Sequence, residues 1–190
     1  MKKESSLSTL ETAKAAVFAA LTFIATFAVK IQTPTFGYIH VGDCFVLLSG
    51  LLLGGPLGAL AAGTGSALSD LMAGYAIWIP GTFIIKFLVA LVAWWSFSAL
   101  KKLFNTEKKF PAGLLIVSGL AGELVMTAGY FFYNIVIISL TSGSFSSASL
   151  AAAITESAAE IPFNIVQGTV GIILATVLYP LVRKGITPRS

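Results

Sequence analysis

The stretch GYIHVGDCFVLLSGLLLGGPLGALAAGTGSALSDLMAGYAIWIPGTFIIK, residues 37–86, decides how this chain folds. Two apolar segments, residues 43–53 and 57–73, flank the turn Gly54-Gly55-Pro56 and predict a pair of packed helices. The stretch also holds the single histidine of the chain, two carboxylates and a lysine, which are His40, Asp43, Asp70 and Lys86. Ionisable side chains beside such apolar sequence are costly and usually functional. We therefore expect a functional site near this hairpin of helices.

The composition predicts an integral membrane protein. Hydrophobic residues make up 56% of the 190 residues and charged residues only 11%, and the mean hydropathy is +0.90. Soluble domains average about 25% charged residues. We expect one domain, residues 1–190, in the plasma membrane of a bacterium. The net charge of +4 does not indicate nucleic-acid binding, because the basic residues lie beside hydrophobic segments, where they orient a membrane protein.

Six hydrophobic segments predict an all-α, polytopic bundle of six transmembrane helices. The expected spans are residues 10–31, 43–53, 57–73, 80–100, 112–138 and 158–182, with an additional short helix over 148–156. Residues 32–42 are expected to form a loop, because Pro34 lacks a backbone donor and cannot continue a helix. The second span is the short one.

Basic residues predict that both termini are cytoplasmic. They gather before and at the start of the first span, between the fourth and fifth spans, and after the sixth, as Lys2, Lys3, Lys14, Lys101, Lys102, Lys108, Lys109, Arg183, Lys184 and Arg189. The opposite loops, residues 32–42, 74–79 and 140–157, contain no Lys or Arg. The positive-inside rule therefore places these loops outside the cell.

Two helical stripes of polar residues point to a cavity in the outer half of the bundle. Each stripe follows a spacing of three or four residues along one helix face, as Glu123, Thr127, Tyr130 and Asn134 in the fifth span and Glu156, Glu160, Asn164 and Gln167 around the sixth. The inner half offers mainly alanine, glycine and aliphatic residues. A polar stripe facing lipid would cost several kcal/mol, so both stripes are expected to face inward.

The candidate substrate-binding residues are polar or aromatic residues expected at this depth: Asp70, Trp78, Lys86, Glu123, Tyr130, Tyr133, Asn134, Glu160, Asn164 and Gln167. The candidate rim or lid residues are Tyr38, His40 and Asp43. Alternatives stay open for several of them. Asp70 and Lys86 either contact substrate or form a structural ion pair, Asp43 either serves the rim or caps its helix, and single polar residues also join membrane helices to one another.

The sequence does not indicate an enzyme. It contains no HExxH, GxSxG, paired-cysteine or phosphate-binding glycine motif, and one histidine is too few for a usual metal site. We therefore expect no catalytic residues, no metal and no bound cofactor. The alternative is a stand-alone solute channel or a membrane-embedded enzyme, but a channel needs polar residues through its full depth.

Three motifs carry a resemblance to a known family. Tyr38-Ile39-His40-Val41-Gly42-Asp43, Gly54-Gly55-Pro56-Leu57-Gly58-Ala59-Leu60 and Gly65-Ser66-Ala67-Leu68-Ser69-Asp70-Leu71, in a six-span chain of this length, resemble the substrate-binding S components of energy-coupling factor (ECF) vitamin transporters. The resemblance is nearest to the branch of riboflavin, hydroxymethylpyrimidine and pyridoxine proteins. It covers essentially the whole chain and is strongest over residues 37–86.

The resemblance implies an importer subunit. A vitamin would be held near the extracellular side and delivered inward with a transmembrane coupling protein and two ATPases, so that only partner subunits use ATP. The family's alanine motif on the first helix, which contacts the coupling protein, matches Ala15 and Ala19, and an overlapping copy matches Ala16 and Ala20. The excess of acidic groups over outer lysines favours pyridoxine or hydroxymethylpyrimidine, with riboflavin next, over a phosphorylated ligand.

Overall fold

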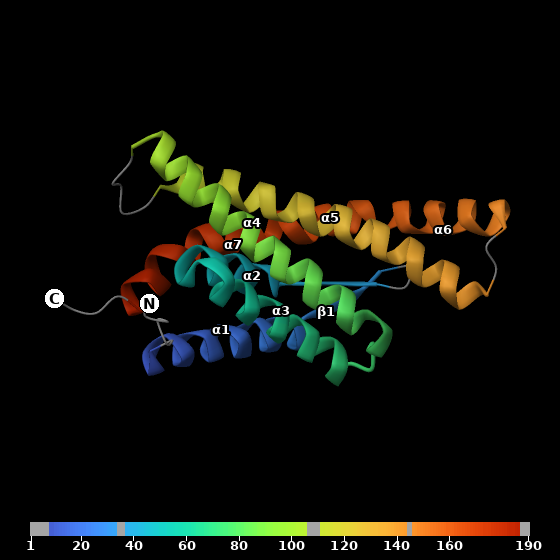
Figure 1. Cartoon of the computed structure of the whole chain (residues 1–190), viewed down its shortest axis with the longest axis horizontal. Helices are drawn as coiled ribbons and strands as arrows, with labels where there is room; N and C mark the ends of the chain where they lie inside the picture. Colours follow the sequence, from blue (N-terminus) through green and yellow to red (C-terminus); the bar gives the residue numbers. More distant parts are fainter. Residues whose placement is uncertain (1–7, 34–36, 106–110, 144–145, 187–190) are drawn as a thin grey trace, which may run out of the picture.

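The computed structural model describes residues 8–33, 37–105, 111–143 and 146–186 (Figure 1). The elements in chain order are α1 (Thr9–Ala28), β1 (Lys30–Gln32), β2 (Tyr38–His40), α2 (Asp43–Leu53), α3 (Gly55–Met72), the 3-10 turn η1 (Ala76–Trp78), α4 (Ile79–Leu103), α5 (Ala112–Ser142), α6 (Ser147–Ala159) and α7 (Ile161–Ile186). Several residues used to predict orientation or the first loop lie outside the described residues: Lys2, Lys3, Pro34, Lys108, Lys109 and Arg189.

The all-α polytopic bundle is confirmed. Among the described residues, four helical stretches are long and apolar enough to cross a membrane: Thr9–Ala28, Ala76–Leu103, Ala112–Ser142 and Ser147–Ile186. The helix α2 has 11 residues and is about 16 Å long at ~1.5 Å per residue, too short to span ~30 Å of hydrocarbon. The short helix expected over 148–156 is longer than predicted, and α6 continues into α7 with only Glu160 between them.

The hairpin of α2 and α3 lies at the centre of the bundle. Glycines allow its backbones to approach their neighbours, because a Cβ atom on Gly58 would lie 2.3 Å from the carbonyl oxygen of Ser49 in α2. A Cβ atom on Gly50 would lie 2.3 Å from the carbonyl oxygen of Ala90 in α4. Close backbone contact at small residues is the usual way in which membrane helices pack. The hairpin is thus held on both sides by contacts that no larger residue permits.

The helix α1 packs on α3 through one face and leaves the opposite face exposed. Its start is a capping box, in which Ser8 Oγ accepts a hydrogen bond from Glu11 N and Glu11 Oε2 accepts one from Ser8 N. A Cβ atom on Gly65 of α3 would lie 2.3 Å from the carbonyl oxygen of Ala19. Ala16 and Ala20 lie on the other face of α1 and are exposed.

A short antiparallel β-hairpin replaces much of the loop predicted over residues 32–42. Its register pairs Lys30 with His40, Ile31 with Ile39 and Gln32 with Tyr38. Each strand has only three residues, too few for a recognisable alternation of polar and apolar side chains. The hairpin and η1 lie toward the right in Figure 1, whereas α1 begins and α7 ends at the left.

Candidate functional site

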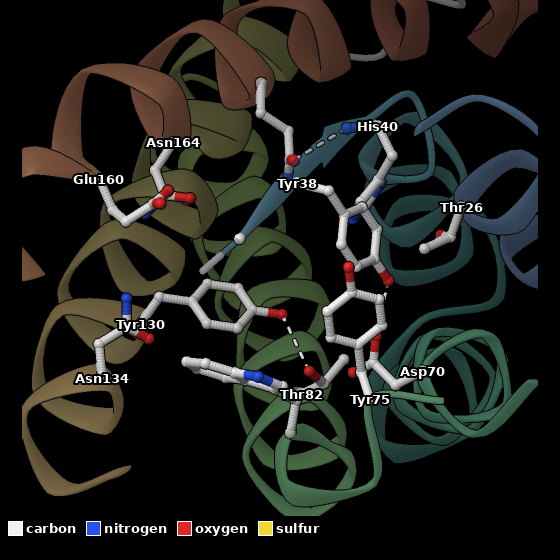
Figure 2. A pocket seen from close by; sticks show the side chains of 13 residues that line it. Thr26, Tyr38, His40, Asp70, Tyr75, Thr82, Tyr130, Asn134, Glu160 and Asn164 are labelled. Carbon is white, nitrogen blue, oxygen red and sulfur yellow. Dashed lines mark hydrogen bonds between the residues drawn. The ribbon is translucent and has the colours of Figure 1, made fainter. Parts of the chain in front are cut away.

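A small cavity of about 60 Å³ lies at the end of the bundle where the β-hairpin packs against the helices. Its lining comes from β2, α3, η1, α4, α5, α7 and Glu160 between α6 and α7, with one residue from α1 (Figure 2). The lining residues are Thr26, Gly37, Tyr38, His40, Asp70, Tyr75, Trp78, Thr82, Tyr130, Asn134, Glu160, Asn164 and Gln167.

Aromatic rings form one part of the lining. The rings of Tyr38 and Tyr75 lie 5.2 Å apart between centroids, and the hydroxyl of Tyr130 donates to Thr82 Oγ1 over 3.3 Å. Figure 2 shows the Tyr38, Tyr75 and Tyr130 rings around the same space. Rings held this way offer faces on which a planar ligand can stack.

Amides and carboxylates form the other part. Asn134 and Gln167 are buried, and Asn164 lies beside Glu160 (Figure 2). Asp70 and Glu160 are also buried, and no Lys or Arg belongs to the described lining. The cavity therefore presents several hydrogen-bond donors and acceptors together with an excess of acidic groups.

Hydrogen bonds tie the β-hairpin region down over this cavity at three places. Tyr38 Oη donates to Asp70 Oδ1 of α3 over 2.6 Å, and His40 N donates to Gln167 Oε1 of α7 over 3.0 Å. Thr33 Oγ1 donates to Glu160 Oε1 over 2.7 Å. The β-hairpin of β1 and β2 thus covers the cavity like a roof. Its hydrogen-bond partners on the helices, Asp70, Glu160 and Gln167, are themselves lining residues.

Two side chains of the β-hairpin, Tyr38 and His40, have shifted pKa values. Burial lowers the pKa of His40 to about 4, and nearby Lys86 and Lys30 also lower it, against the opposing effect of Asp43. The neutral ring suits its contact, because Nδ1 accepts a hydrogen bond from Gly42 N over 3.0 Å. Burial and the Asp70 carboxylate raise the pKa of Tyr38, which stays a hydroxyl donor at every physiological pH.

A buried ion pair lies below the cavity. Lys86 Nζ donates to Asp43 Oδ1, and both side chains are 0% exposed. Gln167 Nε2 donates to Asp43 Oδ2 over 2.6 Å, and Met126 Sδ lies 2.9 Å from Lys86 Nζ. The helices α2, α4, α5 and α7 therefore meet at one polar contact.

This ion pair corrects two predictions. Asp43 is neither a rim residue nor a helix cap, because it is fully buried and Gly42 is the N-cap of α2 without a side-chain hydrogen bond. Lys86 pairs with Asp43 and not with Asp70, and it lies outside the lining. Burial explains both differences. A buried ammonium is costly without a carboxylate beside it, so Lys86 and Asp43 are buried together as a pair.

The other predicted residues divide into two groups. The lining brings together Asp70, Trp78, Tyr130, Asn134, Glu160, Asn164 and Gln167, with Tyr38 and His40. Glu123 and Tyr133 lie outside it. Tyr133 packs on Gly81 and donates to the carbonyl oxygen of Ile77 over 2.7 Å, which fixes η1 against α5.

Four lining residues were not among those predicted from the sequence: Thr26, Gly37, Tyr75 and Thr82. A signal existed for two of them. Thr82 precedes Lys86 by one helical turn, and Thr26 follows Thr22 by one turn in the stretch 15–29, which is otherwise apolar. Within the described parts of the chain, no group of three or more His, Cys, Asp or Glu side chains is arranged to hold a metal ion.

A second, wider hollow adjoins the cavity between η1 and the α5–α6 pair. It shares Tyr75, Trp78, Asn134 and Glu160 with the cavity. Its remaining lining is partly apolar and consists of Ile77, Ile137, Ile138, Thr141, Ser142 and Glu156. The cavity, lined by polar and aromatic side chains, therefore adjoins a hollow with a more apolar lining.

A family model described as "ECF-type riboflavin transporter, S component" matches residues 6–184. An uncharacterised protein of Pyrococcus woesei is 30% identical over 108 residues, which are 56% of this chain and 66% of that protein, slightly under two thirds of its length.

Two solved structures share the fold. A structure of the S component of a bacterial ECF transporter superposes with a TM-score of 0.62 at 19% identity, covering 94% of this chain and 98% of that one. The S component for biotin from an ECF-type ABC transporter superposes with a TM-score of 0.57 at 18% identity, covering 94% and 95%. These identities support the shared architecture alone.

Proposed function

This chain belongs to the family of ECF-type riboflavin transporter S components, and from that premise we propose that it binds riboflavin in the cavity under the β-hairpin. As a family member it is a multi-pass membrane transport protein and not an enzyme. The observation that carries the proposal is the lining itself, in which aromatic rings face buried amides and carboxylates without any Lys or Arg among the described lining residues.

This lining suits an unphosphorylated flavin. An isoalloxazine ring offers flat faces for stacking on Tyr75 or Tyr130 and a pyrimidine-like edge that side-chain amides such as Asn134 and Asn164 complement. The polyhydroxyl ribityl chain would extend toward the adjoining hollow. Asp70 and Glu160 would repel a phosphate, so flavin mononucleotide should bind less well than riboflavin.

Pyridoxine and hydroxymethylpyrimidine, which the sequence reasoning favoured, are the competing ligands. Both are single rings and would leave the second hollow empty. Riboflavin is preferred because the matching family model carries that ligand in its description, and because a ring with a tail would extend from the cavity into the adjoining hollow.

The proposal also assigns a direction and partners. Lys101, Lys102, Arg183 and Lys184 lie at the end of the bundle opposite the cavity (Figure 1), so the positive-inside rule would place the cavity outside the cell. Riboflavin would then be delivered inward with a transmembrane coupling protein and two ATPases. The exposed alanines Ala16 and Ala20 of α1 are the copy of the alanine motif that is free to dock, because Ala15 and Ala19 pack on the core.

The test is a fluorescence titration of the purified, ligand-free protein. Stacking on aromatic side chains quenches flavin fluorescence, so riboflavin should show saturable quenching, and flavin mononucleotide should need at least tenfold higher concentration. Pyridoxine and hydroxymethylpyrimidine are then added as competitors. Displacement of riboflavin only at large excess supports the proposal, whereas tighter binding of either single-ring vitamin would overturn the choice of substrate.

A further inference from the structure

The carboxylate of Glu123 in α5 has no partner, although it lies deep in the bundle. Its side chain is 6% exposed, and neither Oε1 nor Oε2 has a hydrogen-bond partner within the described residues. An unpaired ionised carboxylate in such a place costs several kcal/mol or more. The riboflavin proposal gives this residue no task, because Glu123 lies outside the cavity lining.

Glu123 lies beside the buried ion pair of Asp43 and Lys86. The groups that act on it electrostatically are Asp43 of α2 and Lys86 of α4. The helix α7 presents only a glycine there, since a Cβ atom on Gly168 would lie 3.0 Å from Oε2 of Glu123. A Cβ atom on Gly171, one turn further along α7, would lie 2.8 Å from Cβ of Asp43. Both carboxylate side chains therefore pack on one glycine face of α7.

The single cation of this cluster is already engaged. Lys86 Nζ bonds Asp43 Oδ1, contacts Met126 Sδ and lies 5.4 Å from the centre of the Tyr130 ring. The amide of Gln167 donates to Asp43 and accepts from His40, so it is not free to serve Glu123. Two carboxylates against one ammonium leave one negative charge in a region from which water is excluded.

We propose that Glu123, beside the Asp43–Lys86 pair, is a buried binding site for one monovalent cation, either a proton or an alkali metal ion. One added positive charge neutralises the cluster and gives the Glu123 oxygens the partner that the protein does not supply. Asp43 is occupied by Lys86 and Gln167, which makes Glu123 the group that holds the cation. The inference stands on this cluster alone and does not depend on which vitamin the chain binds.

Two measurements on the full-length protein in nanodiscs distinguish the two cations. Infrared spectra in H₂O and D₂O detect the carbonyl stretch of a protonated carboxylic acid, and thermal unfolding in sodium or potassium chloride, against choline chloride of equal ionic strength, detects an alkali ion. The variant is Glu123→Gln. The matched control is Glu11→Gln, an exposed position where Gln preserves the capping box.

A bound proton predicts an acid band that is present in the wild type and in Glu11→Gln and absent from Glu123→Gln. A bound alkali ion predicts no such band, together with a saturable rise of the unfolding temperature in sodium or potassium that Glu123→Gln lacks. If the wild type shows neither effect, the proposal is wrong. Should Glu123→Gln not fold, isotope labelling of the glutamate carboxyl carbons in Glu160→Gln assigns the band, because Glu160 is the other buried glutamate of the described chain.

Discussion

Lys86 of α4 and Asp43 of α2 form an ion pair in which neither side chain has any exposed surface. Because Gln167 joins Asp43 to the backbone of His40, this pair also positions the β-hairpin over the cavity. We expect Lys86→Met to lower the free energy of unfolding by about 3–5 kcal/mol, since it leaves Asp43 as an uncompensated buried charge. Unfolding in detergent, followed by circular dichroism, measures the loss.

The double variant Asp43→Asn/Lys86→Met is the control for this expectation. It removes both charges, so its destabilisation should be smaller than the sum for the two single variants. Additive losses would mean that the two side chains do not stabilise each other, and the assignment of a coupled pair would fail.

The contact between Tyr38 and Asp70 should matter for ligand retention. Tyr38→Phe keeps the ring that faces Tyr75 and removes the hydroxyl that donates to Asp70 Oδ1. The loss of one charge-assisted hydrogen bond, worth about 1.5–3 kcal/mol, should loosen the roof and raise the riboflavin dissociation rate about tenfold or more. Stopped-flow fluorescence measures that rate.

The control for Tyr38→Phe is Tyr179→Phe. Tyr179 lies in α7 near Arg183, at the opposite end of the bundle from the cavity. The same chemical change there should leave the dissociation rate unaltered. Equal rates for the wild type and Tyr38→Phe would show that the hairpin anchor does not retain the ligand.

His40 should make stability depend on acid pH. Its pKa is about 4 in the folded protein, below the ordinary value of 6.5. The unfolded chain therefore binds more protons between these values, so this contribution is complete above pH 6.5 and is lost as the pH falls toward 4. Protonation of Nδ1 would also break its hydrogen bond from Gly42 N.

The variant His40→Asn tests this pH dependence. Asn places an acceptor oxygen near the position of Nδ1 but does not titrate. The unfolding temperature of the wild type should fall more steeply than that of His40→Asn between pH 6.5 and 4, while acidic groups contribute equally to both. Parallel curves would show that His40 does not carry the effect.

Sequence periodicity located much of the cavity. A spacing of three or four residues identifies residues on one helix face, and Tyr130, Asn134, Asn164 and Gln167 from two such stripes all reach the lining. The same spacing says nothing of how far a side chain lies from another helix. It therefore did not reveal that Lys86 meets Asp43, or that Glu123 stays outside the cavity. The β-hairpin was missed because strands of three residues have no detectable period.

Close packing of α1 on α3 should make Gly65 intolerant of any side chain. Gly65→Ala would place Cβ 2.3 Å from the carbonyl oxygen of Ala19 and 2.8 Å from Cβ of Thr22, so α1 would have to move. The expected result is a loss of about 1–3 kcal/mol in unfolding free energy. Gly113→Ala is the matched control, because this exposed glycine of α5 has no neighbour within 4 Å of an added Cβ. It should be neutral or slightly stabilising. Equal effects at both positions would contradict the close contact.

The exposed alanine face of α1 should carry the interaction with the coupling protein. Ala16 and Ala20 are four residues apart and exposed, so a helix of the partner can approach them closely. Ala16→Leu adds bulk to this face without entering the core, and we expect it to reduce co-purification with the coupling protein and ATPases at least tenfold. Riboflavin binding should be unchanged, because the cavity receives only Thr26 from α1.

The matched variant is Ala15→Leu, in the overlapping copy of the motif. Ala15 is partly buried against the core, so the added side chain should lower thermal stability and act on docking only through that damage. The two variants thus separate docking from folding. If Ala15→Leu abolishes assembly while its unfolding temperature stays at the wild-type value, and Ala16→Leu assembles normally, then the partner contacts the Ala15 and Ala19 copy, and α1 must turn about its axis on assembly.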